Sequence, residues 1–244
     1  MIKTRDEYSK NGFYLSSFSK TDTYERFLST LRNLLLSDSS IPAGFKWESK
    51  YPLTEDIRPN VFDIDSCFVD ILSENRVHDL LASLTGREDL TLSHIQIRKS
   101  NSEKSYMDWH RDSYPVDGKW IGNNPAVHKL IFYPKINEST PSLKILAGSH
   151  NCVWAFQKSE DMLAPGLSKF DSQIFNFHPV EVYNSSDSEF IVFNTSAIHG
   201  VIPDPPGEKT IRIIYSFVSR DQYEEKYSNK EHHKVVNSMY EKIK

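Results

Sequence analysis

The sequence predicts a mainly β fold with flanking helices, in the form of an antiparallel sandwich or barrel. After Gly86 the hydrophobic period changes from about 3.6 residues to 2, and short strands follow one another at close spacing. The turns between them are rich in Asn, Ser, Asp, Pro and Gly, as at 184–187 and 203–207. Residues 90–220 are therefore the predicted β core.

Two helices are expected before this core. Apolar residues at helical intervals predict the first over residues 22–36. The second is predicted over 73–86, with Ser73 as its N-terminal cap and Gly86 as its C-terminal stop. We expect these helices, which belong to the segment 1–88, to pack on the β core.

The remaining elements follow from the same patterns. Residues 37–65 contain three prolines and predict no regular element. Alternating or apolar runs predict strands at 92–98, 127–133, 143–146, 180–183, 190–194 and 210–219. The charged tail 221–244 predicts a terminal helix that docks on the outside or on a partner chain. No internal repeat or low-complexity linker divides the sequence, so one domain over 1–244 is expected.

Composition narrows the class of protein. The 244 residues have a formal net charge of −4, which indicates no basic surface for nucleic acid. No apolar run reaches membrane-spanning length, and the N-terminal residues lack the apolar run of a signal peptide. Two cysteines are too few for a disulfide framework. We expect a cytoplasmic protein without nucleic-acid or membrane partners, whose oligomeric state the sequence leaves open.

The segment Trp109-His110-Arg111-Asp112 contains a candidate metal site. In an extended segment, side chains two residues apart point to the same side, so His110 and Asp112 converge. One imidazole and one carboxylate are two of the three ligands of a 2-His-1-carboxylate site, which leaves open positions on Fe(II). With nine His and 33 Asp plus Glu, about one His-x-Asp/Glu is expected by chance, so the pair needs further support.

A distant histidine must complete such a site, and His199 has the best context. The apolar strand 190–194 leads to it, and a proline-rich turn returns the chain into the next strand. His199 is therefore expected at a strand end, where the mouth of a barrel presents ligands. Taken alone, this histidine is more often structural.

Two strands place polar side chains among apolar ones. Arg212 lies in the middle of an apolar strand, and a buried guanidinium needs a counter-charge and hydrogen bonds. Its planar group suits a carboxylate, either that of a co-substrate or that of an internal Asp or Glu. His94, Gln96 and Arg98 share one face of the strand at 92–98. That face either meets solvent or lines a polar cavity.

Other motifs exclude two classes of enzyme. His110-Arg111-Asp112 is also the catalytic-loop tripeptide of protein kinases, but the sequence has no Gly-rich phosphate loop and no Asp-Phe-Gly. It also has no His-Glu-x-x-His pattern and no Cys-rich zinc motif. A kinase and a zinc peptidase are therefore excluded.

Taken together, these motifs resemble the Fe(II)- and 2-oxoglutarate-dependent oxygenases of the phytanoyl-CoA dioxygenase family. The resemblance covers about residues 90–220. It rests on the His110 segment, on 143–150, which is similar to the family's Pro-Gly-Ser/Thr-His turn, and on His199-Gly200 followed by Arg212. There are departures: Ala147 replaces the usual Pro, and Val201 stands where the family often has Ser.

The resemblance implies a fold and a set of iron ligands. The fold would be a double-stranded β-helix, the cupin-like jelly roll. Fe(II) would be held by His110, Asp112 and His199, and Arg212 would bind the distal carboxylate of the co-substrate 2-oxoglutarate. The reaction would consume O2, release succinate and CO2, and oxidise an unactivated C–H bond of a small-molecule metabolite.

Further expectations concern the co-substrate and the outcome of the reaction. Gln96 and Lys129 are expected as additional 2-oxoglutarate contacts. Related halogenases have a small residue at the position of Asp112, so hydroxylation is favoured over halogenation. Desaturation, epimerisation and ring closure use the same ligands and stay open.

The sequence says little about the substrate. Trp109, Arg111 and Trp120 are candidate substrate contacts, and 113–125 is a candidate lid, although loop charges are more often solvated. Two other classes of protein remain. One is a non-catalytic cupin-like barrel that binds a ligand or a metal, and the other is an interaction protein that uses the C-terminal helix.

Overall fold

The computed structural model describes most of the chain. The described residues are 2–36, 41, 44–51, 54–58, 65–100, 109–112, 127–135, 141–151, 178–203 and 208–243. Trp120 and the candidate lid at 113–125 lie outside them.

Ten strands of the described part form two antiparallel sheets. The large sheet contains β1 (Phe13–Ser17), β8 (Glu189–Asn194), β5 (His128–Phe132), β10 (Thr210–Ser219), β4 (Leu90–Ser100), β3 (Thr54–Arg58) and β2 (Lys46–Tyr51), in that order. The small sheet contains β7 (Val180–Asn184), β6 (Pro141–Leu146) and β9 (His199–Val201). The predicted strands are thus present, and the mainly β class with flanking helices is confirmed.

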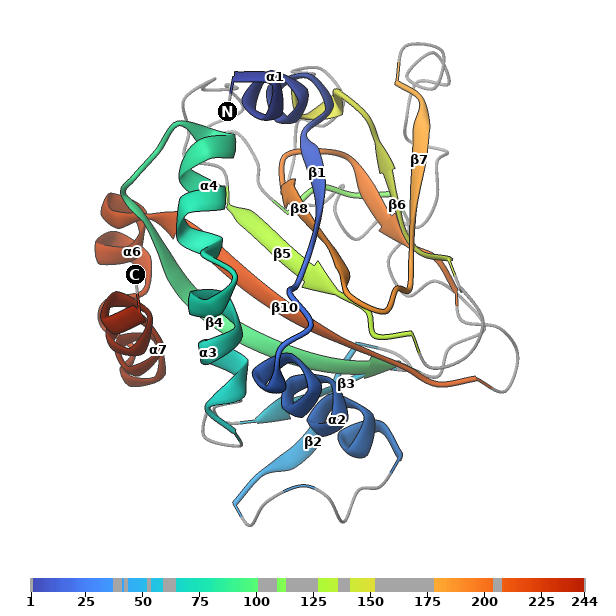
Figure 1. Cartoon of the computed structure of the whole chain (residues 1–244), viewed down its shortest axis with the longest axis vertical. Helices are drawn as coiled ribbons and strands as arrows, with labels where there is room; N and C mark the ends of the chain where they lie inside the picture. Colours follow the sequence, from blue (N-terminus) through green and yellow to red (C-terminus); the bar gives the residue numbers. More distant parts are fainter. Residues whose placement is uncertain are drawn as a thin grey trace.

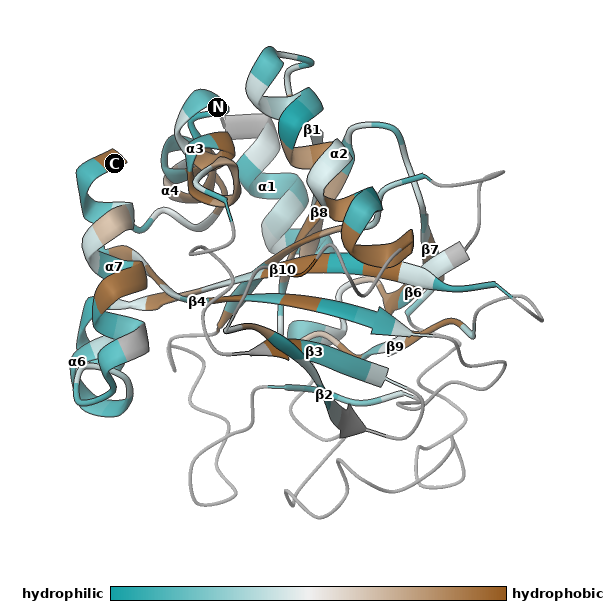
Figure 2. Ribbon diagram, turned by 90° about the horizontal axis from the view of Figure 1, so that it is seen from below, coloured by the Kyte–Doolittle hydropathy of each residue, from teal (hydrophilic) through white to brown (hydrophobic). Residues whose placement is uncertain are grey.

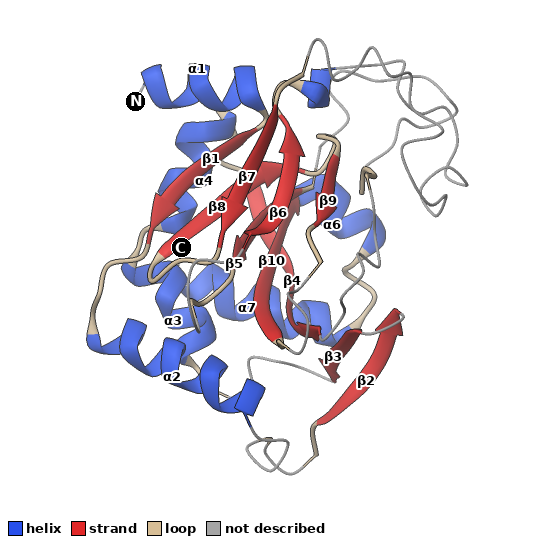
Figure 3. Cartoon of the chain, turned by 90° about the vertical axis from the view of Figure 1, so that its right-hand side faces the viewer, coloured by secondary structure: helices blue, strands red, loops and turns tan. Residues whose placement is uncertain are grey.

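Helices cover one side of the large sheet. They are α1 (Ile2–Asn11), α2 (Asp22–Leu36), α3 (Cys67–Glu74), α4 (Val77–Thr85), α6 (Arg220–Lys226) and α7 (Glu231–Ile243), and a short 3-10 turn, η3 (Ser149–Asn151), follows β6. Figure 1 shows α3 and α4 on the left, β5 and β10 in the middle, and β6 and β7 on the right. Figure 3 shows β6 and β7 side by side. The large sheet is therefore the middle layer.

Strand alternation divides the apolar side chains between two cores. On β10, Ile211, Ile213 and Tyr215 pack toward the helices, whereas Ile214 joins the cluster between the sheets. Figure 2 shows the helices over β10 and β4. The inner cluster contains Ile131, Tyr133, Leu143, Ile145, Tyr183, Ile191, Phe193, Ala197 and Ile214. Every second residue of the central strands thus faces the interval between the sheets.

The predicted start of the second helix, at Ser73, is wrong. The chain forms two short helices there, and Ser73 lies inside α3 instead of capping α4. Arg76, between them, has a φ of 47°, a left-handed conformation that interrupts the helical path. Gly86 ends α4 with a φ of 70°, as predicted.

The sequence predicted an irregular segment at 37–65, whereas the structure has a hairpin of β2 and β3 there. Both strands are largely polar, and β4, the strand that pairs with β3 on its other side, lies far along the chain. Local patterns therefore contain no signal for it, although Asp56 and Ile57 of β3 are fully buried.

The C-terminal tail forms two helices that dock on this chain. Ser219 caps α6, because its hydroxyl accepts a hydrogen bond from the backbone N–H of Gln222. The following helix α7 packs against β4, and its Val236 and Tyr240 side chains enter the larger core. Among the described helices, none has the length and apolar character required to cross a membrane.

The buried face of α7 gives a prediction about stability. Tyr240→Ala should lower the free energy of unfolding by about 3–5 kcal/mol, as truncation of a buried aromatic ring does. The matched control is Val235→Ala on the exposed face, which should cost less than about 1 kcal/mol. Urea denaturation monitored by circular dichroism measures both, and equal losses would show that α7 is not docked as described.

Candidate metal and co-substrate site

Backbone pairing brings the two ligand segments together. His110 and His199 form an antiparallel bridge, in which N–H of His110 donates to O of His199 at 2.8 Å and the reverse bond is 2.9 Å. N–H of Asp112 donates to O of Thr195 at 3.0 Å. Segments far apart in the sequence therefore lie in register, with His110 and Asp112 on the same side as predicted.

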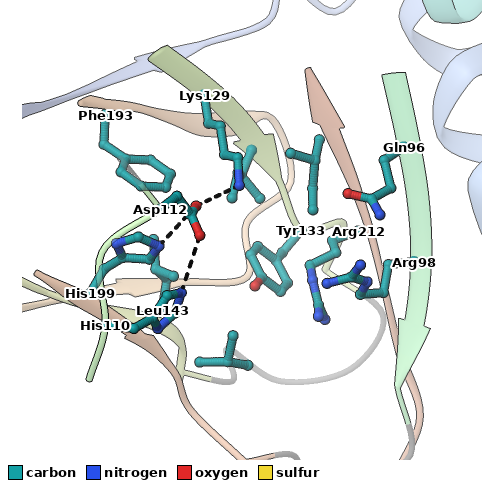
Figure 4. A pocket seen from close by; sticks show the side chains of 13 residues that line it. Gln96, Arg98, His110, Asp112, Lys129, Tyr133, Leu143, Phe193, His199 and Arg212 are labelled. Atoms are coloured by element: carbon teal, nitrogen blue, oxygen red, sulfur yellow. Dashed lines mark hydrogen bonds and ion pairs between the residues drawn. The ribbon is translucent and has the colours of Figure 1, made fainter. Parts of the chain in front are cut away.

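The three predicted ligands converge. Nε2 of His110 lies 3.5 Å from Oδ1 of Asp112, and Nε2 of His199 lies 3.4 Å from Oδ2. All three ligand atoms lie within 4.8 Å of one another (Figure 4). Neighbouring ligands on bonds of about 2.1 Å at right angles lie about 3 Å apart, so these side chains fit a single transition-metal ion.

The tautomer of His199 is set by the backbone carbonyl of Ala197. Nδ1 donates to O of Ala197 at 2.8 Å, which leaves the lone pair on Nε2, the atom that faces Asp112. Burial lowers the pKa of His199, and the neighbouring His110 ring lowers it further against the opposing effect of Asp112. The ring is therefore neutral near pH 7, which is the form that binds metals.

Asp112 is held as a carboxylate. Burial by itself would raise its pKa, but the Lys129 ammonium and the adjacent His110 and His199 side chains outweigh this and hold the pKa well below its usual range. Nζ of Lys129 lies 2.6 Å from Oδ2 of Asp112. An anionic carboxylate between two imidazoles is a suitable ligand set for a divalent cation.

A cavity of about 140 Å³ extends from these side chains between the sheets. Figure 4 shows Arg212 and Arg98 across the cavity from His110, Asp112 and His199. Arg212 is 1% exposed, its Nη1 lies 3.5 Å from Oγ of Ser100, and its guanidinium lies 5.6 Å from the centre of the Tyr133 ring. The predicted carboxylate-binding residue therefore lines the cavity opposite the candidate metal site.

Gln96 and Arg98, two of the three polar residues that share a face of β4, line the cavity, as one of the two interpretations of that strand predicted. The third, His94, lies against the His233 ring of α7, with ring centroids 5.9 Å apart. Arg98 and Arg212 are direct cross-strand neighbours. Asp56 of β3 accepts two bonds from the Arg98 guanidinium, at 2.6 and 2.9 Å, and one from Nε2 of Gln96 at 2.5 Å. Like charges opposite each other are unfavourable, and the Asp56 carboxylate compensates for this.

Asp56 and Arg98 were not among the predicted site residues. Asp56 lies in the hairpin that sequence patterns did not reveal. The available signal was indirect, since a buried Arg98 requires a counter-charge. Gln96 and Lys129, the expected co-substrate contacts, both line the cavity, where Gln96 bonds Asp56 and Lys129 bonds Asp112.

Trp109 and Arg111 point away from the predicted ligands because alternation sends them to the other side of the segment. The Trp109 ring lies 4.5 Å from Nζ of Lys144. Arg111 is 1% exposed and donates to O of Ser149 at 3.0 Å. Neither is among the described residues that line the cavity. Both contact the scaffold behind the site.

Comparison with known proteins identifies the fold. No protein-family model matches the chain, and no curated protein matches it. Solved structures do match. SnoN, a non-heme α-ketoglutarate-dependent epimerase from nogalamycin biosynthesis, has a TM-score of 0.64 and 10% identity, over 89% of this chain and 83% of SnoN. That structure is a complex with Fe³⁺, α-ketoglutarate and nogalamycin RO.

Two further structures give the same result. HygX from Streptomyces hygroscopicus, with nickel, 2-oxoglutarate and hygromycin B bound, has a TM-score of 0.63 and 12% identity, over 90% of this chain and 88% of HygX. The carbocyclase SnoK has a TM-score of 0.62 and 8% identity, over 90% and 84%. At such identities the likeness shows the fold. The chain has the double-stranded β-helix fold of non-heme 2-oxoglutarate-dependent enzymes, and the predicted jelly roll is confirmed.

The buried ion pair behind the cavity gives a second prediction. Asp56→Asn leaves the Arg98 guanidinium without its carboxylate and should lower the free energy of unfolding by about 3–5 kcal/mol. The control is Glu55→Gln on the same strand. The Glu55 side chain is half exposed, and its ion pair with Lys99, 3.2 Å between Oε2 and Nζ, should contribute less than about 1 kcal/mol to stability. Urea denaturation measures the difference, and equal effects would contradict the role of Asp56.

Proposed function

We propose that this chain is an Fe(II)- and 2-oxoglutarate-dependent dioxygenase of the phytanoyl-CoA dioxygenase type, acting on a small-molecule metabolite in the cytoplasm. The observation that supports this is the placement of His110, Asp112 and His199 at one side of a cavity whose other side is lined by Arg212. The double-stranded β-helix fold is consistent with it.

Each side chain has a defined part in this proposal. His110, Asp112 and His199 hold the iron, which when bound couples O2 activation to the oxidative decarboxylation of 2-oxoglutarate. Arg212 binds the distal carboxylate of the co-substrate by charge-assisted hydrogen bonds. Lys129 and Gln96 line the same cavity and are proposed as further contacts.

Apolar side chains complete the cavity. Ile131, Leu143 and Ile214 line it, and they exclude water from the region between Arg212 and the iron ligands. A dry environment strengthens the electrostatic interaction of Arg212 with a carboxylate. The protein's contribution is therefore placement of the co-substrate and of the substrate carbon.

We propose hydroxylation as the overall reaction. One oxygen atom of O2 enters succinate and the other enters the product, so that R–H, 2-oxoglutarate and O2 give R–OH, succinate and CO2. The carboxylate of Asp112 supports hydroxylation over halogenation. Desaturation remains an alternative, as do epimerisation and ring closure, since SnoN is named an epimerase and SnoK a carbocyclase.

A small-molecule substrate is proposed because HygX and SnoN were solved with hygromycin B and nogalamycin RO. Of the three candidate substrate residues, Trp120 keeps that role in the proposal. Trp109 and Arg111 are better explained as residues that support the ligand segment, because their described contacts are to Lys144 and Ser149.

The proposal is tested in two stages. Under anaerobic conditions, Fe(II) plus 2-oxoglutarate should give a weak visible charge-transfer band without any substrate. With O2 and a metabolite panel, the protein should then release succinate. Both signals should fall more than about 100-fold in His110→Ala. Loss of a metal ligand should weaken metal binding more than loss of a residue that only hydrogen-bonds a ligand, which typically costs about 10- to 100-fold.

The control for that variant is His78→Ala. His78 bonds the Tyr240 hydroxyl at 3.1 Å on the helical side of the large sheet, and its loss should leave both signals unchanged. A protein that gives neither the band nor succinate is a non-catalytic barrel, and the enzymatic proposal is then wrong.

The role of Arg212 gives a separate prediction. Arg212→Lys keeps the charge but loses the paired hydrogen bonds of a guanidinium, so KM for 2-oxoglutarate should rise by about 10- to 100-fold with a smaller change in kcat. Arg220→Lys, in the surface pair with Glu241, is the control. Initial rates at varied 2-oxoglutarate measure both, and an unchanged KM would refute carboxylate binding by Arg212.

A further inference from the structure

The turn that follows β6 contacts both segments that supply the candidate ligands. Ser149, the first residue of η3, is fully buried. Its Oγ donates to O of Leu146 at 2.7 Å and accepts from N–H of Ile198 at 2.8 Å. Its carbonyl oxygen accepts from Nη2 of Arg111 at 3.0 Å. One residue therefore contacts the neighbours of all three ligands.

The bond to Ile198 bears directly on His199. The N–H of Ile198 and the C=O of Ala197 belong to the same peptide unit. That C=O accepts the hydrogen bond from Nδ1 of His199 at 2.8 Å. Because the peptide unit is planar, fixing the direction of its N–H also fixes the direction of its C=O. Ser149 thus controls the group that selects the tautomer of His199.

The bond to Arg111 fixes the other segment. Arg111 lies between His110 and Asp112 in the sequence, and its buried guanidinium points to the opposite side from their side chains. Its hydrogen bond to the Ser149 carbonyl ties the 110–112 segment to the same turn. The two ligand segments are therefore positioned against a common residue.

The turn itself is held firmly. N–H of Gly148 donates to O of Asn11 at 2.7 Å, and O of Ala147 accepts from Nδ1 of His178 at 2.8 Å. Gly148 has a φ of 77°, and a Cβ atom there would lie 3.2 Å from O of Lys10, so the close approach to α1 requires glycine. A turn fixed from the outside is a suitable reference for positioning other groups.

We propose that Ser149 is a positioning residue, which holds the Ala197–Ile198 peptide so that His199 keeps Nδ1 protonated and presents Nε2 to the candidate metal site. The metal-binding part of this inference rests on the proposed function. The tautomer of His199 does not depend on it.

The direct test is the tautomer of His199 in the metal-free protein. Histidine labelled with ¹⁵N and two-bond ¹H–¹⁵N correlation spectra at neutral pH distinguish the two tautomers, with His199→Gln to assign the signal. Wild type should show the Nδ1–H form alone. Ser149→Ala should show a mixture, and Ser149→Thr, which keeps the hydroxyl, should restore the wild-type spectrum.

Ser142→Ala is the matched control. Ser142 is another buried serine, at the start of β6, and its hydroxyl bonds the hydroxyl of Ser185 at 3.0 Å. Its loss removes a serine hydroxyl and its hydrogen bond, and should leave the tautomer unchanged. A general loosening of the fold would instead affect both alanine variants.

Metal binding is the second measurement. By titration calorimetry, Ser149→Ala should weaken Ni(II) binding about 10- to 100-fold, and Ser149→Thr and Ser142→Ala should bind as the wild type does. A wild-type His199 that is Nε2-protonated or mixed overturns the inference, even if Ser149→Ala does not fold. An unchanged tautomer in Ser149→Ala also overturns it. Absence of Ni(II) binding in the wild type refutes the proposed function, while the tautomer result still decides the role of Ser149.

Discussion

The reciprocal backbone hydrogen bonds between His110 and His199 fix the geometry on which the candidate site depends. They place two imidazoles from distant segments on the same side of a two-residue ladder, and Asp112, two residues on from His110, meets both Nε2 atoms. On the side of β9 away from His110, β6 pairs with β9 and places Ile145 opposite His199. His199 is therefore held between two neighbours, and its side chain has little freedom to turn away.

Charge inside the jelly roll is arranged in pairs around the cavity. Lys129 accompanies Asp112 at the metal side, and Asp56 accompanies Arg98 at the far side. Buried charges need such partners, because desolvation is costly and the interior strengthens the attraction between opposite charges. Arg212 lies next to Arg98 at the end of the cavity away from the candidate iron ligands.

The elements that sequence patterns predicted well are those with a regular hydrophobic period. Residues 210–219 form a strand with the predicted bounds, in which Ile211, Ile213 and Tyr215 face the helical core and Arg212 and Ile214 line the cavity. The β2–β3 hairpin was missed because its strands are mostly polar, and because β3 joins the sheet by pairing with the distant β4. The start of α4 was misplaced because the left-handed residue Arg76, and not Ser73, separates the two helices.

The sequence by itself determined which residues share a face. Alternation is a local property of an extended chain, so the order of residues alone groups His110 with Asp112, and Gln96 with Arg98. Only the tertiary structure decided which histidine completes the group and which carbonyl selects its tautomer. It also decided that Arg98 pairs with Asp56, and that Trp109 and Arg111 face the scaffold behind the site. These features depend on contacts between segments that are far apart in the chain, and backbone pairing and packing of the whole fold bring those segments together.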